Sequence, residues 1–158
     1  MFIFRQSDQV HSYIQSLINR NRTIAFVPTM GALHEGHMAL IEQAKSKAGI
    51  VVCSIFVNPT QFNDPKDYRH YPNRAMEDKR MLEAKNCDVL FMPEVEEVYP
   101  RGEENYRLNI EMGSLVRLWE GAHRPGHFAG MMQVVKRLLD LIPAEFLVMG
   151  QKDYQQLA

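Results

Sequence analysis

The chain has 158 residues, of which 46% are hydrophobic and 23% are charged, a balance typical of one globular domain with a buried core. Its 18 Lys and Arg stand against 19 Asp and Glu, and the two signs are interspersed along the chain. This charge pattern predicts no nucleic-acid partner and no membrane partner.

The sequence also predicts a cytoplasmic protein. The longest apolar stretch, residues 49–57, is too short to span a bilayer, and the N-terminus lacks the apolar segment of a signal peptide. Cys53 and Cys87 form neither a disulfide framework nor a zinc-binding spacing, so we expect two buried free thiols.

Apolar periodicity predicts an alternation of helices and buried strands in the first part of the chain. A helix is expected over 8–20 with Ser7 as its cap, because apolar residues recur there at steps of three and four. A strand over 23–28, a helix over 37–48 and a Val- and Ile-rich strand over 50–57 follow. This is a β-α-β unit.

The rest of the chain continues the alternation around two irregular segments, 58–73 and 119–130, which are rich in Pro, Gly, Asn and charged residues. Loops of this length are often functional. The other expected elements are a helix over 74–86, strands over 88–93 and 106–112, a helix over 128–142 ending at Pro143, a strand over 144–150 and the start of a helix from 151. The whole pattern predicts an α/β fold, an open parallel sheet with helices on both faces.

The stretches "PTMGALHEGH" (28–37) and "NPTQFNDP" (58–65) each follow a predicted strand directly. Ligands of parallel sheets bind beyond the carboxyl ends of the strands, so both stretches should face one crevice. Gly31 and Gly36 allow a tight turn into a helix, whose first free N–H groups suit an anion such as phosphate. His34 and His37 would lean toward that anion, where imidazolium groups would stabilise charge on a phosphoryl oxygen.

Other interpretations compete with this one. A histidine at a helix start is often a local hydrogen-bonding group. Zinc binding is disfavoured because "HEGH" lacks the H-E-x-x-H spacing and no cysteine lies near it. The P-loop and G-x-G-x-x-G patterns are both absent, so the phosphate chemistry is of neither common type.

Three further stretches carry side chains that suit a polar ligand. Asn58 and Gln61 supply amides for a small polar substrate, and Lys152 supplies a point charge for a phosphate. Arg124 and His127 lie in "HRPGHF", where Gly and Pro are explained equally well by turn geometry.

Taken together, "PTMGALHEGH", "VNPTQF", "EGAHRPGHF" and "GQKDYQQL", in this order and at these separations, resemble the pantothenate synthetase (pantoate–β-alanine ligase) family from about residue 23 onward. The resemblance implies a Rossmann-like nucleotidyltransferase (HxGH) fold. It also implies that ATP adenylates the carboxylate of pantoate with loss of pyrophosphate, and that the amine of β-alanine then displaces AMP to give pantothenate. Magnesium would accompany the ATP, and the protein would be a homodimer.

The resemblance further implies roles for individual residues. His37, as proton donor and phosphate ligand, would act in catalysis with His34 and Lys152. Gln61 would bind pantoate and lie close to β-alanine, with Asn58 in the same loop, and Gln156 would bind the pantoate hydroxyls. The ATP-binding residues would be Met30, Gly31, Ala32, Leu33, His34, Glu35, Gly36, His37, Gly150, Gln151, Lys152 and Asp153. Neither the resemblance nor the sequence assigns the magnesium ligands, for which Glu77 and Asp78 are only candidates.

Two features depart from the family pattern. Many members have Glu where Gln151 stands. The family also continues into a smaller second lobe, so residues 1–158 resemble its N-terminal ATP- and pantoate-binding domain, which we expect to bind substrates but to be impaired in catalysis. The alternatives are a non-catalytic nucleotide-binding or self-associating module, and another HxGH adenylyltransferase acting on a phosphate. Neutral amides at Gln61 and Gln156 disfavour the last of these.

Overall fold

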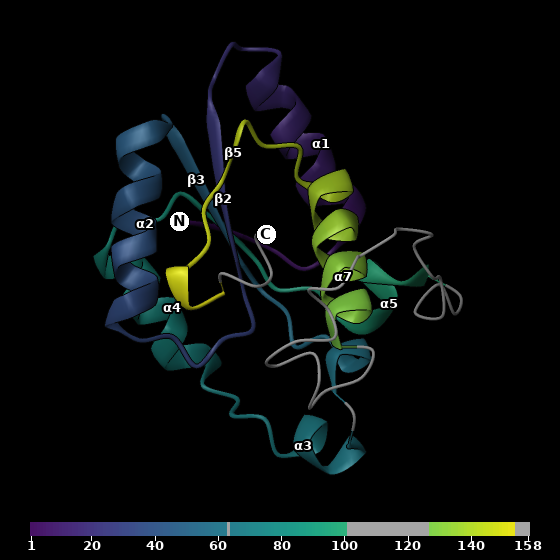
Figure 1. Ribbon diagram of the computed structural model, residues 1–158. Helices are drawn as coiled ribbons and strands as arrows, with labels where there is room; N and C mark the ends of the chain where they lie inside the picture. Colours follow the sequence, from purple (N-terminus) through teal and green to yellow (C-terminus); the bar gives the residue numbers. More distant parts are fainter. Residues whose placement is uncertain (63, 101–126, 154–158) are drawn as a thin grey trace.

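A parallel sheet covered by helices on both faces forms the core of the computed structural model (Figure 1), which describes residues 1–62, 64–100 and 127–153. In this part of the chain five parallel strands lie in the order β1-β4-β3-β2-β5. Their bounds are β1 Phe2–Phe4, β2 Ile24–Thr29, β3 Ile50–Ile55, β4 Val89–Phe91 and β5 Phe146–Leu147. The α/β class expected from the sequence is confirmed.

The two longest of these strands, β2 and β3, pair in register from Ile24 opposite Ile50 to Thr29 opposite Ile55. Most of their side chains are buried, because helices cover both faces of the sheet. Their carboxyl ends therefore lie side by side, and the stretches that follow them leave the sheet at the same edge.

Helices cover both faces of the sheet. On one face, α1 (Ser7–Ile18) and α7 (His127–Leu141) pack into a common apolar cluster, and on the other, α2 (Glu35–Lys47) and α4 (Ala75–Ala84) do the same (Figure 1). The helix between β2 and β3 thus lies on the opposite face from the helix that precedes β5. Since β3 and β5 flank β2 on opposite sides, the strand order reverses at β2, and ligands of open α/β sheets bind at such a switch point.

Most predicted elements appear with shifted boundaries. The helix expected over 8–20 is α1, but Ser7 is its first residue and not its cap, because the Ser7 N–H donates to Glu97 Oε2 at 2.6 Å. The second helix starts at Glu35, so Gly36 lies inside its first turn instead of before it. The strand expected over 144–150 is reduced to Phe146–Leu147 at the sheet edge.

Several short elements were not predicted. These are strand β1, the helices α3 (Pro65–Arg69) and α5 (Val95–Val98), and the 3-10 turn η1 (Pro59–Gln61). The helix expected to start at 151 begins as the 3-10 turn η4 (Gln151–Asp153), and its continuation lies outside the described residues. The segment 58–73 is therefore not wholly irregular. The strand expected over 106–112 and residues 119–126 of the second loop lie outside the described residues.

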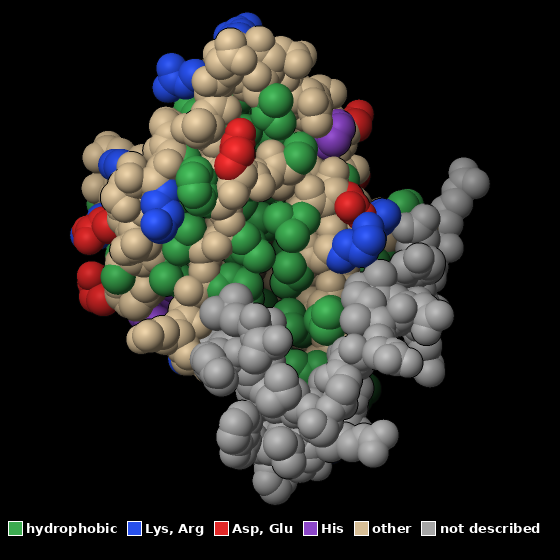
Figure 2. Space-filling view, turned by 45° about the horizontal axis from the view of Figure 1, so that its top comes forward, with side chains coloured by type: hydrophobic (Ala, Val, Ile, Leu, Met, Phe, Trp, Pro, Cys, Tyr) green, Lys and Arg blue, Asp and Glu red, His purple; other side chains and the backbone are tan. Residues whose placement is uncertain are grey.

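Burial and charge agree with the composition. Charged side chains of both signs are scattered over the face shown in Figure 2, and hydrophobic side chains gather in its middle. Cys53 and Cys87 are buried and free, as expected, and burial raises the pKa of Cys87 to about 11. Within the described ranges, no helix is long and apolar enough to cross a membrane.

Candidate active site

A cavity of about 700 Å³ lies beyond the carboxyl ends of β2 and β5, at the switch point of the sheet. This volume is in the range of small-molecule sites. Of the residues singled out from the sequence, the cavity is lined by Met30, Gly31, Ala32, His34, Gly36, His37, Gln61, Gly150, Gln151 and Lys152. Leu33, Glu35 and Asn58 are not among its lining residues, and the side chain of Asp153, together with Gln156, lies outside the description.

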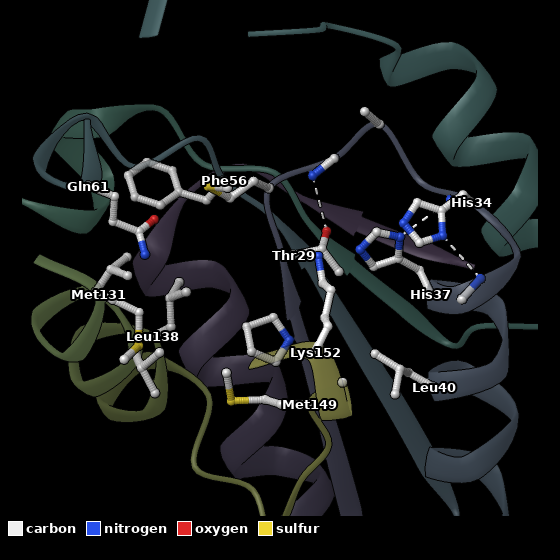
Figure 3. Close-up of a pocket in the computed structure, with 18 of the residues that line it drawn as sticks. Thr29, His34, His37, Leu40, Phe56, Gln61, Met131, Leu138, Met149 and Lys152 are labelled. Atoms are coloured by element: carbon white, nitrogen blue, oxygen red, sulfur yellow. Dashed lines mark hydrogen bonds between the residues drawn. The ribbon is translucent and has the colours of Figure 1, made fainter. Parts of the chain in front are cut away.

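The cavity has a polar end and an apolar end. His34, His37 and Lys152 lie on one side in Figure 3, and Gln61 lies across from them beside side chains of α7. The apolar wall consists of Phe56, Met131, Val134, Val135 and Leu138. The arrangement suits a ligand with an anionic part at one end and a compact apolar part at the other.

The two histidines cap helix α2 together. The backbone of His34 is extended, its Nδ1 accepts the Gly36 N–H at 3.1 Å, and its own N–H donates to His37 Nδ1 at 3.3 Å. The ring centroids are 4.2 Å apart. A β-carbon on Gly36 would lie 2.8 Å from His34 Cε1, so glycine leaves the room that this ring needs.

This cap determines which ring nitrogen carries the proton. Since Nδ1 of each ring accepts a backbone N–H, the neutral imidazoles of His34 and His37 carry their proton on Nε2. The cap also uses the N–H groups that the sequence analysis expected to be free: Gly36 donates to His34 Nδ1 and His37 donates to the His34 carbonyl at 2.9 Å. The Nε2–H groups of the two rings remain as donors for a ligand.

The expectation of two imidazolium groups is wrong for His37 in the free protein. Burial, followed by the positive charges of His34 and Lys152, lowers the pKa of His37 to about 4, while Asp78 acts in the opposite direction. The ring is therefore neutral near pH 7, and a bound polyanion would raise its pKa.

A buried carboxylate that the sequence analysis named only as a metal candidate lies against the loop between β2 and α2. Asp78 Oδ2 accepts the Ala32 N–H at 2.9 Å, and Asp78 Oδ1 accepts the Leu33 N–H at 2.7 Å. The only feature of the sequence that marks Asp78 is its position in the first turn of a predicted helix. Its hydrogen-bond partners lie more than 40 residues away along the sequence.

Asn58 has a role inside the protein. Its amide nitrogen donates to the Gly130 carbonyl of α7 at 3.1 Å, and its oxygen accepts from the Thr60 N–H at 3.3 Å and from the Tyr99 hydroxyl at 3.1 Å. The side chain is fully buried. It ties turn η1, which carries Gln61, to the apolar wall of the cavity.

The described side chains do not form a resident metal centre. No group of three or more His, Cys, Asp or Glu in this part of the chain could hold a metal ion. Both Asp78 oxygens accept backbone N–H groups, and exposed Glu77 lies 3.8 Å from Arg74. The two magnesium candidates therefore do not fit such a centre.

A parallel α/β sheet with an H-x-G-H cap at its switch point is typical of the nucleotidyltransferase fold class. The comparisons with known proteins give the family. The family model described as Pantoate-beta-alanine ligase matches residues 2–158, and the chain belongs to that family.

Relatives and solved structures agree with this assignment. The pantothenate synthetase of Francisella tularensis subsp. novicida is 48% identical over 158 residues, and that of Cytophaga hutchinsonii is 45% identical over 150 residues. The crystal structure of pantoate-beta-alanine ligase from Francisella tularensis, complexed with beta-gamma ATP and beta-alanine, has a TM-score of 0.93 at 46% identity. The crystal structure of pantothenate synthetase from Thermus thermophilus has a TM-score of 0.90 at 43% identity.

These matches cover nearly all of this chain but only part of each relative. They span 99% of the chain against both structures, and 59% and 54% of the Francisella and Thermus chains respectively. The curated Francisella relative is covered over 59% of its length, and the Cytophaga relative over 52%.

Proposed function

We propose that this chain is the ATP- and pantoate-binding domain of an AMP-forming pantoate–β-alanine ligase. The observation that carries the proposal is the cavity at the switch point, which has His34, His37 and Lys152 at one end and Gln61 at the other. Membership of the ligase family and the ATP complex of the Francisella ligase support it.

In this proposal the polar end of the cavity binds the phosphates of ATP. A pantoate carboxylate oxygen attacks the α-phosphorus, the bond to the bridging oxygen breaks, and pyrophosphate leaves. Negative charge grows on the phosphoryl and leaving oxygens, where the Nε2–H groups of His34 and His37 and the ammonium of Lys152 would stabilise it. The amine of β-alanine then attacks the acyl carbon, and AMP departs.

The apolar end fits pantoate, whose central carbon carries two methyl groups. These methyl groups would pack against the apolar side chains of Met131, Val134 and Leu138. The Gln61 amide would form hydrogen bonds with a hydroxyl or the carboxylate of pantoate. Asn58 would act indirectly by holding η1, and Gln156 would add hydrogen bonds from outside the described residues.

Three further parts of the proposal do not come from the cavity: magnesium and dimerisation rest on the family, and the cytoplasmic location rests on the sequence. Magnesium would enter bound to the ATP phosphates and neutralise part of their charge. The chain would form a homodimer, and sedimentation can measure this oligomeric state. It would work in the cytoplasm.

The experiment that tests the function is exchange of labelled pyrophosphate into ATP, with and without pantoate. We expect exchange that depends on pantoate and falls about a hundredfold or more in His37→Ala, the loss typical of one preorganised donor. His70→Ala is the matched control, because His70 is exposed and does not line the cavity. This substitution should leave exchange unchanged. ATP binding without exchange would point to a binding module, and exchange driven by a phosphorylated acceptor would point to another adenylyltransferase.

A further inference from the structure

We propose that Asp78, on helix α4, is a positioning residue that sets the shape of the nucleotide-binding loop, residues 30–33. The proposal rests on the proposed function, since it assumes that this loop binds ATP. Asp78 acts through the loop backbone and does not itself touch the ligand.

The first part of the loop borders open space. Met30 and Gly31 line the large cavity and also a second one, of about 510 Å³. Asp78 lines this second cavity. Packing against Ile55 holds part of this backbone, and hydrogen bonds add to that restraint.

The conformation of the loop is also unfavourable by itself. Gly31 has φ +82° and Ala32 has φ +50°, a left-handed region that costs a non-glycine residue energy. The Gly31 N–H donates to Thr29 Oγ1 at 3.2 Å, and the next two N–H groups along the loop donate to Asp78, which is 1% exposed. A β-carbon on Gly31 would lie 3.1 Å from Asp78 Oδ2, so the backbone packs directly against the carboxylate.

The same bonds decide what the loop offers to a nucleotide. The N–H groups of Ala32 and Leu33 donate to Asp78, so they are not available to a phosphate as in a P-loop. The loop instead forms part of the wall of the large cavity. It continues directly into His34 at the helix cap. Asp78 thereby fixes the position of the His34 and His37 rings relative to residues 30–33.

The test compares Asp78→Asn with Asp88→Asn. The first substitution leaves one acceptor oxygen for two N–H groups, whereas Asp88 accepts the Val51 N–H at 2.8 Å where β3 begins, at the opposite edge of the sheet. We expect Asp78→Asn to weaken ATP binding about ten- to a hundredfold in calorimetry, and to leave pantoate binding within about twofold. Asp88→Asn should leave both affinities unchanged.

Amide hydrogen exchange provides a readout that does not depend on ligand. Exchange at Ala32 and Leu33 should speed up at least about tenfold in Asp78→Asn and stay unchanged in Asp88→Asn. Unchanged exchange, unchanged ATP affinity, or equal loss of ATP and pantoate would each overturn the proposal.

Two further outcomes are decided by the unsubstituted protein. If Asp78→Asn does not fold, the test uses the parent protein, in which the Ala32 and Leu33 amides should be protected from exchange. Rapid exchange of these two amides in the parent protein would overturn the proposal. If the parent protein binds no nucleotide, the proposed function fails and with it the role in ATP binding, while faster exchange at the two amides in Asp78→Asn would still show that Asp78 holds the loop.

Discussion

At the scale of single residues, His37 shows how a helix cap changes the chemistry of an ionisable side chain. Its Nδ1 accepts a backbone N–H, its ring is half-buried, and the positive charge of Lys152 acts on it. These conditions favour the neutral ring with its proton on Nε2. The neutral ring still offers its Nε2–H as a hydrogen-bond donor to a phosphate.

This account predicts a specific dependence of stability on pH. Burial lowers the pKa of His37 from 6.5 to about 4, so between these values the unfolded chain binds a proton that the folded protein does not. His37 therefore makes the free energy of unfolding rise as pH increases from about 4 to 6.5. Urea denaturation across this range should show a smaller rise in His37→Gln than in the parent protein. Equal rises, or a His37 ring that titrates near its ordinary pKa by NMR, would contradict the account.

The sequence predicted the side chains around the cavity better than those that hold them in place. His34, His37, Gln61 and Lys152 were predicted because each follows the end of a strand, and parallel topology brings those ends together. Asn58 was predicted to bind pantoate, which stays a prediction, and Asp78 was named only as a candidate metal ligand; neither internal role was predicted. Their actual partners, such as Leu33 and Gly130, are far away in the sequence, and local patterns carry no signal for such contacts.

At the scale of elements, the sequence predicted the long, strongly periodic segments and missed several of the short ones, although β4 and β5 were predicted with wider bounds. Helix α7 and strand β3 have continuous apolar faces over many residues. Strand β1 has three residues, and its existence depends on pairing with β4, which the sequence around it does not encode. The turn η1 depends likewise on contacts with α7.

The close approach of α7 to η1 gives a prediction at this scale. A β-carbon on Gly130 would lie 2.4 Å from the Thr60 carbonyl oxygen, so Gly130→Ala should push the two elements apart. We expect a loss of about 1 to 3 kcal/mol in the free energy of unfolding, against the gain that alanine normally brings to a helix.

The matched control for this change is Gly49→Ala. The atom nearest to its new β-carbon is 3.6 Å away, an ordinary contact. Urea denaturation of both variants measures the difference. Equal stabilities of the two variants would mean that α7 and η1 do not pack as closely as described.

At the scale of the whole molecule, the sheet brings together segments that are far apart in the sequence. The end of β2, the start of α2, the turn η1, helix α7 and the segment after β5 all line one cavity. The chain spans 59% of the curated Francisella relative that it matches, and it contains the HxGH cap and Lys152 within that span. Nucleotide binding is therefore the property to test first in this chain.

The most direct test is NMR of the backbone amides and histidine rings during titration with Mg-ATP. The account predicts saturable shifts at residues 30–37 and 150–152, with His34 and His37 ring signals moving in the same titration, and little change at the opposite edge of the sheet around Val51. An absence of binding, or shifts confined to residues outside this cavity, would contradict the claim that the switch point of this sheet binds ATP.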